Sequence, residues 1–127
     1  MTVGLVVVSH SERAAEGIRE VAAEMAGDTR IESVGGDGQG GIGTVPDAIT
    51  EVIASADDGD GVVVLVDLGS AVMNADVAIE MGDVDAVIAD APVLEGAVNA
   101  AVAATDPNAT MDTVREQAEA ARDIEKL

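Results

Sequence analysis

Runs of aliphatic residues alternate along this chain with segments whose apolar positions recur every three or four residues. The first run, residues 2–8, is continuous and rich in valine, which predicts a parallel strand covered on both faces. Three later segments predict further strands, at 30–34, 62–66 and 85–89. Helical spacing predicts amphipathic helices over 12–25, from 46, from 70, over 93–104 and over 111–124.

This order of elements indicates the fold class. Strands that alternate with helices form right-handed βαβ units, in which a parallel sheet carries helices on both faces. We therefore predict a doubly wound α/β fold with the strand order 2-1-3-4, a mainly parallel sheet and room for a further strand at its edge. The chain has no linker and no tandem repeat, so its 127 residues are predicted to form a single domain, 1–127.

The residue types that are missing exclude several kinds of chemistry. The chain has no cysteine and one histidine, so disulfides, thiolate nucleophiles and a metal site are not expected. It has no aromatic residue, which rules out stacking on bases. No apolar run approaches the roughly 18 residues of a membrane span, so a cytoplasmic protein without membrane contact is expected.

Charge narrows the choice of partners and surroundings. Twenty-five acidic residues stand against six basic ones, for a net charge of −19. Nucleic-acid binding is not expected, because phosphate contacts need lysine and arginine. Like charges destabilise a compact chain in dilute salt, whereas molar salt reduces the Debye length to about 3 Å. The sequence therefore predicts a protein of a halophile.

His10 follows the first predicted strand directly, and Asp67 follows the third. In the order 2-1-3-4 these strands are neighbours at the topological switch point, so the two side chains should face each other. An aspartate that accepts the Nδ1 proton would leave Nε2 as a free nucleophile. Backbone amides near Ser70, which is predicted to cap the third helix, would suit phosphoryl oxygens. The pattern favours formation of a phosphohistidine.

Simpler interpretations of these residues stay open. His10 alone could be a solvated side chain at a strand end, and Asp67 could be a helix cap or a loop acid. Ser9 and Ser11 either contact substrate or end the strand and cap the next helix. The segment 36–41 matches the dinucleotide pattern GxGxxG, but no helix opens directly after it and no Walker lysine follows.

The glycine-rich segment has two remaining interpretations. It is either a flexible surface loop or a loop that packs beside His10. In the second case it would offer backbone donors, with Gly36 among them, and the hydroxyl of Thr44.

Taken together, the motifs resemble a known family. Residues 8–11, 35–37 with 42–44, and 66–71 with Asn74 are similar to mannose-type EIIA domains of the phosphotransferase system, especially their dihydroxyacetone kinase branch. The resemblance extends from about residue 1 to about residue 104. It implies a mannose-type EIIA-like fold, and it implies that His10 accepts a phosphoryl group from the carrier protein HPr while Asp67 hydrogen-bonds it.

The resemblance also implies the partners. The phosphoryl group would pass to ADP, held with magnesium in a separate nucleotide-binding subunit, and then to dihydroxyacetone on a third subunit. The chain itself would bind no cofactor and would form a homodimer. Gly36, Thr44 and Ser70 are the expected contacts on the phosphate side, with Ser9 and Ser11 in support.

Three other functions are alternatives. The chain could be the EIIA component of a mannose-type sugar transporter, within the same class of chemistry. It could instead be a regulatory binding module that is controlled by phosphorylation of His10. A small dinucleotide-binding domain is the third alternative, and binding of NAD by the isolated chain would favour it.

Overall fold

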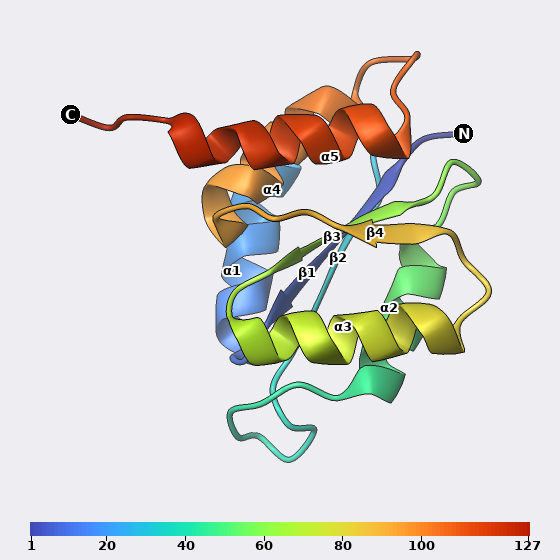
Figure 1. Ribbon diagram of the computed structural model, residues 1–127, viewed down its shortest axis with the longest axis vertical. Coiled ribbons are helices and arrows are strands. Elements are labelled where there is room, and N and C mark those ends of the chain that lie inside the picture. The colour runs from blue at the N-terminus through green and yellow to red at the C-terminus, as the bar shows by residue number, and fades with distance from the viewer.

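Strands and helices alternate along the chain in the structure, a computed structural model that describes residues 1–127 (Figure 1). The strands are β1 (Gly4–Ser9), β2 (Ile31–Gly35), β3 (Val62–Val66) and β4 (Ala86–Ile88). The α-helices are α1 (Glu12–Ala23), α2 (Pro46–Ala56), α3 (Gly69–Met81), α4 (Val93–Ala104) and α5 (Met111–Glu119), and a 3₁₀ turn follows at Ala120–Asp123. All four strands run parallel in one sheet, in the order β2-β1-β3-β4.

The strand order places the ends of β1 and β3 side by side. Val8 of β1 lies opposite Val66 of β3, while Ser9 lies opposite Gly35 of β2 on the other side. The chain leaves β1 towards one edge of the sheet and β3 towards the other, which creates a topological switch point between them. The predicted α/β class and strand order are confirmed. The sheet is entirely parallel, and no fifth strand extends its edge at β4.

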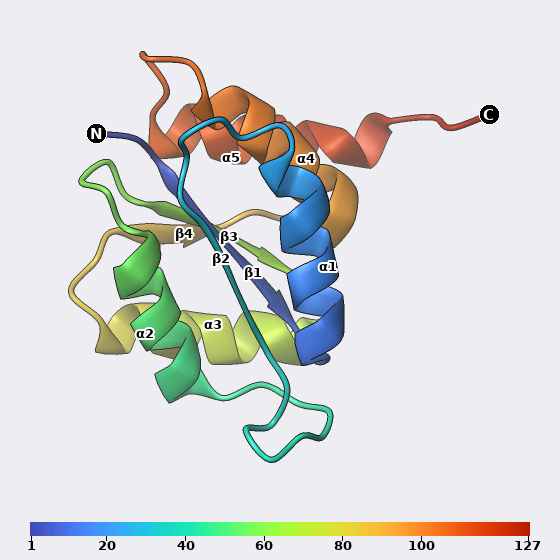
Figure 2. The ribbon, with the colours of Figure 1, turned by 180° about the vertical axis from the view of Figure 1, so that it is seen from behind.

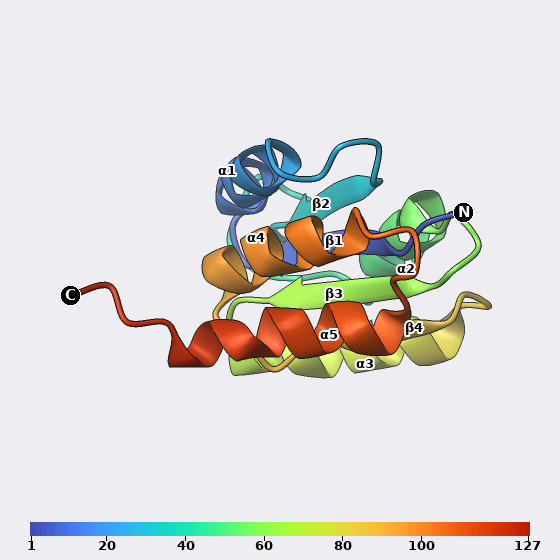
Figure 3. The same cartoon turned by 90° about the horizontal axis from the view of Figure 1, so that it is seen from above.

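Side chains of the central strands divide between two cores, because successive residues of a strand point to opposite faces. Leu5 and Val7 belong to the core under α1, α4 and α5, whereas Val6 and Val8 belong to the core under α2 and α3. Figure 2 shows α1 on the side of α4, and α2 with α3 on the opposite side. Figure 3 shows α5 lying along the sheet with β3 behind it. Both faces of the sheet are therefore covered.

Small residues form the fully buried face of α3. The sequence pattern predicts an apolar stripe on α3 that includes Met73 and Val77, but both side chains are exposed and Met81 is exposed with them. The residues of α3 that pack on the sheet are alanines at positions 71, 75 and 78. Since the strands already supply bulky valines, alanine lets the helix approach the sheet closely. Val72 and Ile79 pack half-buried beside these alanines, whereas Met73, Val77 and Met81 are left on the surface.

Several boundaries differ from the sequence pattern. α1 ends two residues early, and the final helix tightens into the 3₁₀ turn after Glu119, as helix ends often do. β4 is only three residues long, although the carbonyl of Asp85 and the N–H of Ala89 still make single hydrogen bonds to β3. No helix combines the length and the apolar character that crossing a lipid bilayer requires.

Candidate functional site

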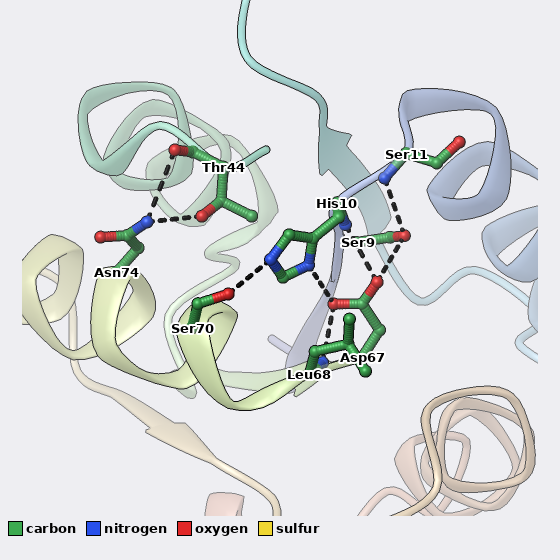
Figure 4. Close-up of polar contacts among 8 residues, drawn as sticks. All are labelled: Ser9, His10, Ser11, Thr44, Asp67, Leu68, Ser70 and Asn74. Carbon is green, nitrogen blue, oxygen red and sulfur yellow. Dashed lines mark hydrogen bonds and ion pairs between the residues drawn. The ribbon is translucent and has the colours of Figure 1, made fainter. Parts of the chain in front are cut away.

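His10 and Asp67 meet at the carboxyl end of the sheet, each one residue beyond its strand. The Nδ1 atom of His10 lies 2.9 Å from Oδ1 of Asp67 (Figure 4). The main-chain N–H of His10 donates to the other oxygen, Oδ2, also at 2.9 Å. Each side chain is 19% exposed, so the pair is accessible from one side. Because the carboxylate accepts from Nδ1–H, the tautomer with a lone pair on Nε2 is favoured.

The surroundings of Asp67 keep it ionised. Burial by itself raises the pKa of the carboxyl, because it disfavours the charged form. Hydrogen bonds from the His10 main chain, the His10 ring and the Ser9 hydroxyl outweigh this effect, and the pKa of Asp67 lies below its ordinary value. A carboxylate that is held charged beside Nδ1 also stabilises positive charge on the ring.

The sequence predicts a free Nε2 atom, whereas in the structure Nε2 contacts the hydroxyl of Ser70. The prediction that Ser70 caps α3 is wrong: Leu68 occupies the N-cap position without a side-chain cap, and Ser70 lies in the first turn. Its hydroxyl is therefore available to the imidazole and donates to the Nε2 lone pair. The N–H groups of Gly69 and Ser70 have no acceptor within the helix, and they direct a positive field towards this side of the ring.

Two serines flank His10 and have different partners. The Ser9 hydroxyl donates to Oδ2 of Asp67 at 2.8 Å and accepts the N–H of Ser11 at 3.1 Å. The Ser11 hydroxyl accepts the N–H of Ala14 at 3.2 Å and caps α1. Ser9 thus holds the carboxylate that holds the imidazole, whereas Ser11 begins the helix and does not contact the ring.

Gly36 lies at the start of the glycine-rich loop with φ +81°, a conformation that glycine adopts without strain. It lines a hollow of about 420 Å³ together with Ser11, Arg13 and the loop glycines. The structure therefore brings Gly36 to the start of α1 and not among the groups that hydrogen-bond the imidazole.

Asp37 folds the glycine-rich loop back on itself. Its Oδ1 accepts the N–H groups of Gln39 at 2.7 Å and Gly41 at 2.9 Å. These hydrogen bonds, that from Gln39 first, lower the pKa of the Asp37 carboxyl. Amides that would bind a pyrophosphate in a dinucleotide fold are occupied here by an internal carboxylate, so the loop does not match a dinucleotide site.

Thr44 follows the glycine-rich loop and contacts Asn74 of α3. The Asn74 side-chain amide donates to the Thr44 hydroxyl and, at 3.5 Å, to the Thr44 carbonyl. Asn74 belongs to the motif that carries the family resemblance, but the sequence pattern gave it no role in the site. Its position four residues after Ser70 is the signal that could have found it, because residues i and i+4 share one face of a helix. Figure 4 shows Thr44 and Asn74 on the side of the ring that carries Nε2.

Large apolar side chains stand exposed in the segments that surround the site. Ile42 is 74% exposed, Leu68 is 61% exposed and Met73 is 70% exposed. Ile42 precedes Gly43, whose N–H donates to the His10 carbonyl at 2.9 Å. Leu68 follows Asp67, and Met73 lies three residues after Ser70 on α3. Exposed apolar side chains therefore occur in three segments that adjoin the site, in a chain of net charge −19.

This arrangement suits nucleophilic chemistry at Nε2. One ring nitrogen is held as a donor by a charged carboxylate, and the other has a lone pair beside hydroxyl and amide donors. Donors placed where negative oxygens will lie stabilise a transferring phosphoryl group. No group of three His, Asp or Glu side chains lies close enough together to hold a metal ion.

A model of a protein family defines the class of this protein. The family, EIIA-man, is described as "PTS system fructose IIA component" and matches residues 4–115. The chain therefore belongs to the EIIA-man family of the phosphotransferase system.

Individual relatives indicate a particular branch of this family. The chain is 40% identical over 105 residues to the "PEP-dependent dihydroxyacetone kinase 2, phosphoryl donor subunit DhaM" of Listeria innocua, a match that covers 79% of this chain and 84% of that protein. It is 37% identical over 119 residues to the "PTS-dependent dihydroxyacetone kinase, phosphotransferase subunit DhaM" of Lactococcus lactis, covering 94% and 95%. A crystal structure of a protein of unknown function, EF1359, superposes with a TM-score of 0.81 at 31% identity and covers 94% of both chains.

Proposed function

We propose that this protein is the phosphoryl donor subunit of a dihydroxyacetone kinase that depends on phosphoenolpyruvate. His10 is the residue that carries the phosphoryl group, and Asp67 orients it. The observation that carries the proposal is the contact of 2.9 Å between Nδ1 and Oδ1, which directs the Nε2 lone pair towards the donors at the start of α3. The similarity to DhaM subunits over most of their length supports the same function.

Each transfer exchanges one bond to phosphorus for another. The Nε2 lone pair attacks the phosphoryl group on the phosphohistidine of HPr, a P–Nε2 bond forms, and the donor ring takes back its electron pair. Because Nδ1 keeps its proton, the imidazole of His10 becomes positively charged, and Asp67 stabilises that charge. In the second step an oxygen of the ADP β-phosphate attacks the phosphorus, and the electron pair of the P–Nε2 bond returns to His10.

The partner proteins of this relay would approach the imidazole of His10 from the solvent. HPr and the nucleotide-binding kinase subunit would each cover the exposed surface around Nε2, where Ile42, Leu68 and Met73 supply apolar contacts. High salt suppresses attraction between charged surfaces. Apolar contacts remain effective at high salt, so we expect this acidic chain to bind its partners through them. We also propose a cytoplasmic homodimer that serves glycerol and dihydroxyacetone metabolism, as the family resemblance implies.

A reconstituted relay tests the function. Enzyme I, HPr and labelled phosphoenolpyruvate should produce an acid-labile phosphoryl group on the wild type and none on His10→Gln. Adding the nucleotide-binding subunit with ADP, and the subunit that binds dihydroxyacetone, should discharge the label to dihydroxyacetone phosphate. A label that forms but never discharges would favour a regulatory role, and a labelled His10→Gln variant would contradict the choice of residue.

A further inference from the structure

The side-chain amide of Asn74 connects two parts of the site. It extends from α3, one helical turn after Ser70, and donates both to the hydroxyl and to the carbonyl of Thr44. Thr44 stands where the glycine-rich loop ends and α2 begins, with Val45 as the N-cap of α2. Asn74 thus fastens the end of the loop to the helix that bears Ser70.

A second contact fastens the same segment to His10. The N–H of Gly43 donates to the carbonyl of His10 at 2.9 Å. Gly43 has φ +152°, and three other glycines of the loop have positive φ, so this backbone has much conformational freedom to lose when it is ordered. The hydrogen bonds of Gly43 and Thr44 therefore determine where the Thr44 hydroxyl lies relative to the imidazole.

The direction of the hydrogen bond from Asn74 determines what the Thr44 hydroxyl can do. A hydroxyl has one proton to donate and two lone pairs with which to accept. Because the amide N–H occupies a lone pair, the Thr44 proton has to point elsewhere, and it donates to no acceptor in the protein. By contrast, Thr50 and Thr105 donate their hydroxyl protons to carbonyls. The half-buried hydroxyl of Thr44 is a donor that is held in place without an acceptor.

We propose that Asn74 is a positioning residue that acts through Thr44. It fixes the Thr44 hydroxyl as a donor to an oxygen of the phosphoryl group on Nε2, opposite the donors at the start of α3. The inference rests on the proposed phosphorylation of His10 and adds a residue that touches neither the ring nor the phosphoryl group. Once Nε2 carries the phosphoryl group, it has no lone pair left to accept from Ser70. The phosphoryl oxygens then lie between the donors at the start of α3 and the hydroxyl of Thr44.

Single variants give the first test, with the rate of transfer from phosphorylated HPr to His10 as the measurement. Asn74→Leu keeps a similar side-chain volume but removes the amide, and it should lower the maximal rate about tenfold, since a hydrogen bond to a charged group contributes that much. The KM for HPr should change less than twofold, because the amide of Asn74 is engaged by Thr44 and is not among the exposed apolar residues proposed to contact HPr. Asn99 is the matched control: it also lies on a helix and donates to a carbonyl, that of Gln117 at 3.1 Å, away from the site. Asn99→Leu should transfer at the rate of the wild type.

The double variant shows whether Asn74 acts through Thr44. Thr44→Val should slow transfer by at least the same factor, whereas Thr44→Ser, which keeps the hydroxyl, should retain most of the rate. Adding Asn74→Leu to Thr44→Val should then cost less than a further twofold. The ³¹P chemical shift of phosphorylated His10 should move in Asn74→Leu and in Thr44→Val but not in Asn99→Leu, and a merely structural role would not produce this pattern.

Two results would overturn the inference while leaving the proposed function intact. One is a wild-type rate in Asn74→Leu or in Thr44→Val, with His10 still phosphorylated. The other is an undiminished effect of Asn74→Leu in the Thr44→Val background. If Asn74→Leu does not fold, as judged by circular dichroism, Asn74→Ala takes its place in the same comparisons, alone and combined with Thr44→Val. A wild type that is never labelled would instead refute the proposed function.

Discussion

Asp67 binds the main chain and the ring of His10 with different oxygens: Oδ2 accepts the N–H and Oδ1 accepts from Nδ1, each at 2.9 Å. The two residues are 57 positions apart in the chain, yet the pairing of β1 with β3 brings their strand ends together. Since one carboxylate fixes both the backbone and the imidazole, the ring has little freedom to turn. The sheet itself therefore sets the direction in which Nε2 points.

Removing this carboxylate should slow phosphorylation strongly. Asp67→Ala is expected to lower the rate of transfer from HPr to His10 by roughly 10²-fold or more, because the tautomer and the positive charge on the ring lose their support. Asp58 offers a matched control, since it also accepts two hydrogen bonds, from the N–H and the hydroxyl of Thr2 at 3.1 Å each, but away from His10. Asp58→Ala should leave the rate unchanged, and an unchanged rate in Asp67→Ala would remove Asp67 from the site.

Stability in acid should depend on the same carboxylate. The pKa of Asp67 in the folded protein lies below the 3.8 of an unperturbed aspartate, so the unfolded chain binds the proton more readily. Its contribution to the free energy of unfolding is therefore complete well above pH 3.8 and is lost as the pH falls through the lowered value. Urea unfolding of the wild type and Asp67→Asn should show a difference at pH 6 that shrinks below pH 4. A difference that grows in acid would contradict the direction of the shift.

Two glycines in ordinary backbone conformations should respond oppositely to alanine. A Cβ on Gly35 would lie 2.5 Å from the carbonyl oxygen of Ser9 and 2.8 Å from that of Ser11, so Gly35→Ala should destabilise the protein by about 1–3 kcal/mol or more. A Cβ on Gly17, within α1, would meet nothing within 4 Å. Gly17→Ala should raise stability by about 0.5–1 kcal/mol. Thermal unfolding of both variants checks the pair, and equal shifts would mean that the close approach at Gly35 is not rigid.

A charge on the apolar surface should impair docking without affecting the ring. Met73→Glu is expected to raise the KM for HPr severalfold, because an exposed apolar contact is replaced by a charge that must be desolvated. Met25, which is 53% exposed just beyond the C-terminal end of α1, provides the control variant Met25→Glu. Steady-state phosphorylation at varied HPr measures both. Equal KM values for the two variants would place the docking surface elsewhere.

Salt should raise the stability of this protein up to molar concentrations. The net charge of −19 implies repulsion that is screened as the ionic strength rises. The midpoint of thermal unfolding should therefore rise between 0.1 M and 2 M potassium chloride. Sucrose, which is not ionic, should not reproduce the initial steep part of that rise. A midpoint that is flat in salt would refute the halophilic interpretation.

The sequence predicts the sheet of this protein better than its helices. The continuous valine runs favour β1 and β3 as strands that are covered on both faces, and the adjacency of His10 and Asp67 follows from them. Helix faces are less predictable here, because the alanines that pack inward carry a weak apolar signal. The exposed Met73 and Val77 carry a stronger one, and they mislead the assignment of the buried face of α3.

Local contacts within the site are the part that the sequence does not predict. Ser70 follows a strand end and looks like a cap, but the helix begins one residue before it and its hydroxyl turns to Nε2. Asn74 is part of the family motif, but its contact with Thr44 becomes visible only when α3 and the start of α2 are placed in space. Such assignments depend on a shift of one or two residues at a helix start, which is below the resolution of a hydrophobic pattern.

The lone imidazole has a practical consequence. The chain contains no phenylalanine, tyrosine or tryptophan, so in heavy water the aromatic region of its proton NMR spectrum holds only the two carbon-bound protons of His10. That ring lies between Asp67 and Ser70 at the rim of the sheet, and every change in those two signals reports events there. The molecule thus carries a built-in spectroscopic probe at the place where its chemistry is proposed to occur, and no isotope label is needed to read it.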